Sequence, residues 1–126
     1  MITKTKKQEQ MEKRTSPRLV LNERNPVYLN LLNSPVLEMI KIREISKGGL
    51  KIQLTSSLMD KKTGEVLKGV LKVPGQKAFL VFMEIVFIEM EDGHKMAGMR
   101  FVKINKNEEN VIDNFVRDRI NNKVAV

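Results

Sequence analysis

The segment at residues 79–90 constrains the fold more than any other part of the chain, because it is apolar on both faces of an extended strand. Successive side chains of a strand point to opposite faces. The apolar residues are Phe79, Val81, Met83, Ile85 and Phe87 on one face and Leu80, Phe82, Val86 and Ile88 on the other. Both faces of such a strand need a cover. We expect the interior of a barrel or sandwich on one face and a helix on the other.

Five further segments have the composition of strands, and turn signals separate them. Glycine, proline and polar residues mark these turns, at residues 33–35, 61–64, 74–75 and 91–93. The predicted strands are residues 27–31, 39–43, 50–54, 65–73 and 95–102. Together with residues 79–90 they make about six short strands, which is typical of a small closed or nearly closed β-barrel.

The last part of the chain is predicted to be a helix that begins near Asn107 as its cap, with Glu108 and Glu109 in an acidic first turn. Apolar residues then recur at helical spacing. They are Val111, Ile112, Phe115, Val116 and Ile120. We expect this face to pack on the chain's own sheet rather than on a partner. The sequence thus predicts a mainly β fold, a six-stranded antiparallel barrel with a C-terminal α-helix.

Length and composition limit the classes of protein that remain. The 126 residues suffice for one domain, without a membrane-length apolar run or a signal-peptide pattern. We expect a soluble, cytoplasmic protein with no membrane insertion. The lack of cysteine excludes disulfides, thiolate catalysis and cysteine metal sites. The net charge of +8 favours an anionic partner, but nucleic acid, a nucleotide, an acidic lipid surface and simple solubility all remain open.

Residues 1–24 are predicted to form a flexible basic N-terminal arm ahead of a barrel domain at residues 25–126. The arm has seven lysines and arginines against three glutamates, and its first dozen residues have no apolar stripe that would dock them. Arg14 and Arg18 lie four residues apart across Pro17. Because proline disfavours helix in the residue before it, this spacing suits an extended or bent clamp. A solvated basic tail is the alternative interpretation.

Residues 44–49 join two predicted strands through a polar corner. Glu44 and Ser46 are two residues apart, so extended backbone places a carboxylate and a hydroxyl on the same face. Gly49 removes a side chain beside them, which permits a positive φ or the close approach of another group. The corner indicates a small polar platform for a ligand. The alternative is a corner that only turns the chain.

These motifs, in this order, resemble the PilZ domain family. The family's pattern is RxxxR, followed by an Asp or Asn, any residue, Ser, two residues and Gly. The residues that carry the resemblance are Arg14, Arg18, Glu44, Ser46, Gly49 and the strand end at residues 98–101. The resemblance extends over residues 13–120. It implies a six-stranded barrel that binds the bacterial second messenger cyclic di-GMP.

The resemblance also implies a role for each motif residue toward cyclic di-GMP, which carries two phosphates and two guanines. Arg14 and Arg18 match positions that hold phosphate oxygens and the guanine Hoogsteen edge by forked donation. Ser46 matches the position of a hydroxyl that donates to ligand oxygens. Gly49 matches a position where the backbone comes close to the ligand, and Glu44 matches the acceptor for a guanine Watson–Crick edge. Ligand would then pull the arm onto the barrel, and a downstream protein partner would read this rearrangement.

The sequence departs from the family's pattern at Glu44, where the family has Asp or Asn. The extra methylene shifts the acceptor by about 1.5 Å, one carbon–carbon bond, which leaves open whether binding is weakened or lost. A competing idea is that Glu44 points to solvent, or pairs with Arg14 or Arg18 in the absence of ligand and hinders them. Lys13 lies where a basic residue is associated in the family with an intercalated ligand dimer, so the ligand stoichiometry stays open.

Three functions are compatible with these observations. The first is a non-enzymatic cyclic di-GMP receptor, and the second is a PilZ-like barrel that has lost ligand binding and acts as a protein-interaction module. The third, a single-stranded nucleic-acid binder on an OB-like barrel, is disfavoured because the phenylalanines lie in apolar strands, at a strand end or on the helix face. We expect no catalytic residue, metal or further cofactor, since His94 is the only histidine and Glu84, Glu89 and Glu91 are interpreted as surface acids. The oligomeric state is not predicted.

Overall fold

The structure is a computed structural model that describes residues 16–22, 27–32 and 38–124. Within these ranges eight strands form one sheet, and neighbouring strands are antiparallel. A short 3-10 helix (Ser56–Leu58) follows the fifth strand, and α2 (Lys106–Val124) follows the last. The strands are β1 (Leu19–Val20), β2 (Tyr28–Leu31), β3 (Glu38–Ile40), β4 (Ile42–Ser46), β5 (Gly49–Gln53), β6 (Val66–Lys72), β7 (Phe79–Glu91) and β8 (His94–Val102).

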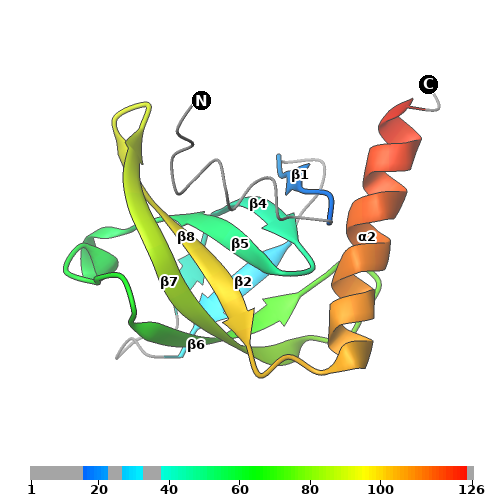
Figure 1. The fold of residues 1–126 in the computed structure, drawn as a ribbon, viewed down its shortest axis with the longest axis horizontal. Coiled ribbons are helices and arrows are strands. Elements are labelled where there is room, and N and C mark those ends of the chain that lie inside the picture. Colours follow the sequence, from blue (N-terminus) through cyan, green and yellow to red (C-terminus); the bar gives the residue numbers. More distant parts are fainter. Residues whose placement is uncertain (1–15, 23–26, 33–37, 125–126) are drawn as a thin grey trace, which may run out of the picture.

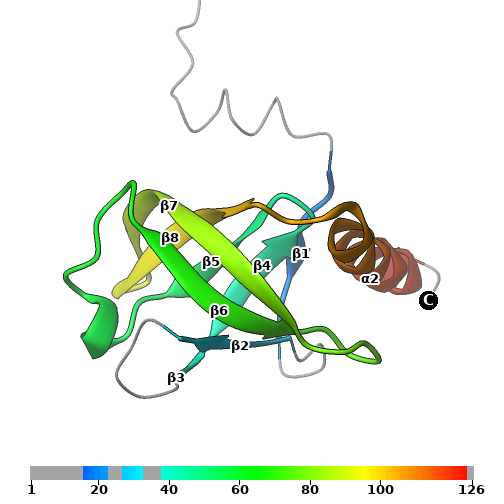
Figure 2. The same ribbon diagram turned by 90° about the horizontal axis from the view of Figure 1, so that it is seen from below.

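The order of the strands shows that the sheet curls into a barrel-like shape (Figures 1 and 2). The order is β1-β4-β5-β8-β7-β6-β2-β3, so β3 lies at one end of the sheet and β4 next to the other end. Only Lys41 separates these two strands along the chain. One residue of extended chain spans about 3.5 Å. The two ends of the sheet are therefore close together.

The sequence predicted one strand over residues 39–43, and the structure has two. β3 pairs with β2, whereas β4 pairs with β1 and β5. The change of partner occurs at Lys41, whose carbonyl accepts a hydrogen bond from the Gln53 amide at 3.2 Å. β1, from the predicted arm, is a further strand that the sequence did not predict. The described residues thus form eight strands instead of six, and the predicted mainly β antiparallel fold with a C-terminal helix is confirmed.

The helix does not cover the second apolar face of β7, where the sequence predicted a helix. Val81, Met83 and Ile85 are buried inside the curled sheet, and Leu80 on the opposite face is 43% exposed. α2 packs mainly against β4 and β1 instead. The short connection after β8 carries the helix to that side of the barrel (Figure 1). The outer face of β7 is therefore open to solvent at Leu80.

α2 begins with a different cap from the one predicted. The side-chain oxygen of Asn105 accepts a hydrogen bond from the Glu108 amide at 2.8 Å, so Asn105 is the cap and the prediction of Asn107 is wrong. Glu108 and Glu109 lie in the first turn, as predicted. The predicted apolar face is confirmed and packs into the core through Val111, Ile112, Phe115, Val116 and Ile120. In the described chain, no helix is both long and apolar enough to cross a membrane.

Candidate ligand-binding site

The hairpin of β4 and β5 presents the polar corner. A two-residue turn connects the strands, so Ser46 lies opposite Gly49 and Glu44 lies opposite Lys51. Ser46 is 8% exposed; its hydroxyl oxygen accepts a hydrogen bond from the Gly48 amide at 3.3 Å and donates to the Gly49 carbonyl at 3.5 Å. The serine therefore helps to close the turn, and it also lines the pocket described below.

Gly49 is required because strand β8 passes close to it. A Cβ atom on Gly49 would collide with the carbonyl oxygen of Met99 and lie 3.0 Å from the Cα of Arg100. Gly49 is not among the residues with a positive φ. The sequence suggested either a positive φ or a close approach. The structure shows the close approach, and the approaching group is a neighbouring strand.

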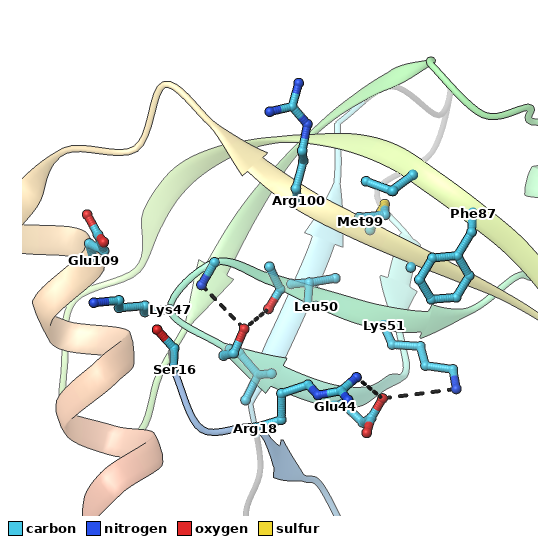
Figure 3. A pocket seen from close by; sticks show the side chains of 16 residues that line it. Ser16, Arg18, Glu44, Lys47, Leu50, Lys51, Phe87, Met99, Arg100 and Glu109 are labelled. Atoms are coloured by element: carbon cyan, nitrogen blue, oxygen red, sulfur yellow. Dashed lines mark hydrogen bonds and ion pairs between the residues drawn. The ribbon is translucent and has the colours of Figure 1, made fainter. Parts of the chain in front are cut away.

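A pocket of about 380 Å³ lies over this hairpin and extends to β7, β8 and α2 (Figure 3). Its volume is in the range typical of small-molecule sites. The segment before β1 contributes Ser16 and Arg18, and α2 contributes Glu109. The sheet and its turn contribute Glu44, Ile45, Ser46, Lys47, Gly48, Gly49, Leu50, Lys51, Val86, Phe87, Gly98, Met99 and Arg100.

Two cations approach the Glu44 carboxylate from its two sides (Figure 3). Arg18 Nη1 lies 3.8 Å and Lys51 Nζ lies 4.0 Å from the same oxygen, Oε2 of Glu44. All three side chains are partly exposed, at 28% for Arg18, 23% for Glu44 and 14% for Lys51. The pairing of Glu44 with Arg18, which the sequence left open, is present in the structure.

Lys51 is the centre of a wider acidic network. Besides Glu44, its ammonium group lies 3.0 Å from Glu89 Oε1 and donates a hydrogen bond to Glu91 Oε2. Burial by itself lowers the pKa of Lys51. The hydrogen bonds to Glu91 and Glu89, together with the charges of Glu89 and Glu44, raise the pKa by more than burial lowers it. The pKa of Lys51 therefore lies above the ordinary value for lysine. Lys51 is therefore charged at neutral pH and ties β5 to the end of β7.

The pocket lining carries more cations than carboxylates. The charged lining residues are the cations Arg18, Lys47, Lys51 and Arg100 and the acids Glu44 and Glu109. Arg100 donates through Nε to Glu84 at 3.0 Å and points away from the β4–β5 hairpin (Figure 3). Glu84, Glu89 and Glu91, which lie outside the lining, pair with Arg100 and Lys51 and offset part of this positive charge.

The structure brings together the predicted site residues that it describes. They are Arg18, Glu44, Ser46 and Gly49, and all four line the pocket. Two other predicted site residues, Lys13 and Arg14, lie outside the described residues. Their part in the site stays a prediction.

Lys51, Phe87 and Arg100 are among the lining residues that the sequence did not assign to the site. A signal existed for Lys51, because the two-residue turn fixes the register of the hairpin and places Lys51 opposite Glu44. Arg100 lies in the strand end at residues 98–101 that carries the family resemblance, but no local pattern indicated that Arg100 or Phe87 lines the pocket. Their positions depend on the pairing of β7 with β8, whose register shifts at a bulge between Ile85 and Phe87.

His94 and the acids Glu84, Glu89 and Glu91 have partners within the part of the chain that the structure describes. Among the described residues, no group of three or more His, Asp or Glu side chains is placed to hold a metal ion. The acids Glu84, Glu89 and Glu91 each form an ion pair with a cation. His94 begins β8, and its Nδ1 lies 3.2 Å from Gln53 Nε2.

The chain is similar to one protein family and to several solved structures. A family model described as the PilZ domain matches residues 12–118. No curated protein matches the chain. The complex of K. pneumonia MrkH with c-di-GMP has 18% sequence identity and a TM-score of 0.73, covering 90% of this chain and 55% of that chain. The PilZ domain of Escherichia coli YcgR with c-di-GMP has 16% identity and a TM-score of 0.66, covering 90% of this chain and 98% of that chain.

A third solved structure, the Bacillus subtilis inhibitor of motility, has 14% identity and a TM-score of 0.72, covering 88% of this chain and 53% of that chain. This chain spans about half the length of the MrkH and inhibitor chains and nearly all of the YcgR domain. At these identities the likeness shows a shared fold.

Proposed function

This chain belongs to the PilZ domain family, and from that premise we propose that it is a non-enzymatic receptor that binds cyclic di-GMP. One observation carries the proposal: Arg18, which lies 26 residues before Glu44 in the sequence, lines the same pocket as the hairpin residues Glu44, Ser46 and Gly49. Two structures with the same fold, of K. pneumonia MrkH and the E. coli YcgR domain, are complexes with c-di-GMP. We expect the ligand to be bound without any reaction.

The pocket residues suit a ligand with two phosphates and two guanines. Arg18 offers a planar fork of donors for phosphate oxygens or for the guanine Hoogsteen edge. Arg14 would supply a second fork and Lys13 a further positive charge. As a donor, the Ser46 hydroxyl makes only a long, 3.5 Å hydrogen bond, to the Gly49 carbonyl. Rotation of this hydroxyl toward a ligand oxygen would therefore cost little.

When ligand binds, the ion pair between Arg18 and Glu44 must break so that both side chains can contact the ligand. At 3.8 Å, and with both side chains partly exposed, this pair contributes on the order of 0 to 1 kcal/mol. A hydrogen bond between a charged Glu44 and the Watson–Crick edge of guanine contributes roughly 1.5 to 3 kcal/mol. Because the gain exceeds the loss, we propose that Glu44 accepts from guanine although it is longer than the Asp or Asn of the family pattern.

We further propose that the ligand draws the arm, residues 1–24, onto the barrel domain at residues 25–126, and that a downstream protein reads this change. Arg18 belongs to the arm and Glu44 to the barrel, so a ligand held by both connects the two parts. Leu19 already pairs with β4, and the rearrangement would therefore concern the residues before it. A cytoplasmic location fits this role for a second-messenger receptor.

Limited digestion with trypsin tests the rearrangement of the arm. Trypsin should cut after Arg14 or Arg18 quickly without ligand and slowly with saturating cyclic di-GMP, because a bound arginine is withheld from the protease. Equal cleavage rates in the two conditions would contradict the rearrangement and leave the binding itself untouched.

Calorimetric titration with cyclic di-GMP and, in parallel, with a single-stranded oligonucleotide tests the receptor function. We expect micromolar or tighter binding of cyclic di-GMP, and a loss of about 1.5 to 3 kcal/mol in Arg18→Ala. Arg117→Ala is the matched control, because Arg117 pairs with Asp113 on α2 outside the pocket lining. Binding of the oligonucleotide alone, or no binding of cyclic di-GMP at high concentration, would contradict the proposal.

A further inference from the structure

Lys51 belongs to neither sequence motif, yet it lies in the same row of the sheet as Glu44. The row crosses four strands through successive register partners: Glu44 on β4, Lys51 on β5, Gly98 on β8 and Phe87 on β7. All four residues line the pocket. A side chain at position 98 would collide with the ring of Phe87. The side chains of this row therefore share one surface of the sheet at the candidate site.

The ammonium group of Lys51 has a fixed place because three carboxylates surround it. Glu89 and Glu91, at the end of β7, make the two closest contacts. Glu44 is the more distant partner, at 4.0 Å. Only 14% of the Lys51 side chain is exposed. Lys51 is thus anchored from outside the pocket while its charge also acts on Glu44 inside it.

Arg18 and Lys51 both form an ion pair with the same oxygen of Glu44, but of these two residues only Lys51 would retain its ion pair when ligand binds. Under the proposed function Arg18 turns toward the ligand, which removes one of the two cations at Oε2 (Figure 3). Glutamate has one more rotatable bond than the aspartate of the family pattern. Fixing this longer side chain costs more conformational entropy, and a neighbouring charge that restrains it in advance reduces that cost.

We propose that Lys51 is a positioning residue of the ligand site, which holds the Glu44 carboxylate in place to accept hydrogen bonds from a guanine Watson–Crick edge. This inference rests on the proposed function. A carboxylate only accepts, so it suits the N1–H and N2–H donors of guanine and not the edge of adenine, whose N1 is an acceptor. Lys51 would therefore support the choice of guanine over adenine.

Competition calorimetry on the full chain tests this role, with cyclic di-GMP as ligand and cyclic di-AMP as competitor. Lys51→Met removes the charge and keeps the stem. It should weaken cyclic di-GMP binding about tenfold when Glu44 is present and less than about twofold in the Glu44→Ala background, because the effects of substitutions at residues that act as a unit are not additive. Lys51→Met should also reduce the ratio of the affinity for cyclic di-GMP to the affinity for cyclic di-AMP. Lys51→Arg keeps the charge and should bind within about threefold of the parent.

Lys47→Met is the matched control, because it removes the same charge from the lining of the same pocket. The described ion pairs of Glu44 involve Arg18 and Lys51, and not Lys47. Whatever effect Lys47→Met has on affinity, that effect should be equal in the parent and in the Glu44→Ala background. Thermal unfolding of every variant before titration separates a loss of folded protein from a loss of affinity.

The outcomes distinguish this role from the receptor function itself. An equal loss from Lys51→Met in both backgrounds would show that Lys51 acts independently of Glu44 and would overturn the positioning role. Tighter binding by Lys51→Met would overturn it too, because Lys51 would then withhold Glu44 from the ligand. A parent chain that binds no cyclic di-GMP would remove the receptor function, and the positioning role with it.

Discussion

The β4–β5 and β7–β8 hairpins both have tight turns with glycine, yet their turns are specified in different ways. In the β7–β8 turn, Asp92 and Gly93 have positive φ values of 51° and 79°, as a type I′ turn requires. In the β4–β5 turn, neither Gly48 nor Gly49 has a positive φ. Gly49 is needed there because β8 passes close to it. One turn is set by local backbone geometry, and the other by packing against a third strand.

This difference matters because the β4–β5 hairpin lines the candidate site, whereas Asp92 and Gly93 are not among the pocket residues. The Phe101 amide of β8 donates a hydrogen bond to the Gly48 carbonyl at 2.9 Å, which fastens the turn to its neighbour. A turn fixed on a third strand holds Ser46 in one place. The packing that requires Gly49 is therefore also the packing that positions the site.

The largest expected effect is the loss of stability in Gly49→Ala. The new methyl group would collide with the backbone of β8, which cannot move away without breaking the sheet. We expect a loss of about 3 kcal/mol or more in the free energy of unfolding, measured by urea denaturation. A loss below about 1 kcal/mol would show that β8 yields easily and that packing does not set this turn.

Glu44 provides the next largest effect, on ligand affinity. Glu44→Ala should weaken cyclic di-GMP binding by roughly 1.5 to 3 kcal/mol through loss of the guanine acceptor, and Glu44→Asp should bind as well as the parent or better. Titration of both variants beside the parent at one salt concentration checks this. An Ala variant that binds more tightly than the Asp variant would show that Glu44 mainly hinders Arg18.

Gly93→Ala should have a smaller effect, confined to stability. A Cβ at this position meets no atom within 4 Å, so only the positive φ of 79° is strained. We expect a loss of about 1 to 2 kcal/mol in the free energy of unfolding and an unchanged affinity for cyclic di-GMP. A change in affinity beyond about threefold would show that the β7–β8 turn is coupled to the site.

Gly48→Ala should have the smallest effect. A Cβ here has its nearest neighbour, Ser46 Oγ, at 4.0 Å, and no positive φ opposes it. Since alanine reduces the freedom of the unfolded chain, stability should stay within about 1 kcal/mol of the parent or rise slightly. A destabilisation as large as that of Gly49→Ala would contradict the contrast between these neighbouring glycines.

The sequence predicted the elements whose signals are local. Alternation and turn residues indicated the strands, and the spacing of Ile112, Phe115 and Val116 indicated the helix face, which is buried as predicted. The split of one predicted strand at Lys41 depends on which strands pair across the sheet. Such pairing joins residues far apart in the sequence, so alternation alone could not reveal it.

The candidate site could be predicted only in part, for the same reason. The motif comparison identified Glu44, Ser46 and Gly49 on one hairpin, and the structure places Arg18 beside Glu44. The Lys51 network joins β5 to acids at the far end of β7. This contact requires the β7–β8 register with its bulge, which no local pattern in the sequence encodes.

Amide NMR during a titration with cyclic di-GMP tests the central claim most directly, because it reports binding and its location together. We expect saturable shifts that are largest at Arg18, Ser46, Gly49 and Lys51, with small shifts at Gly93. Unchanged spectra at high ligand concentration would contradict the receptor function. Shifts concentrated on the outer face of the sheet around Leu80 would place the ligand elsewhere and contradict the proposed site.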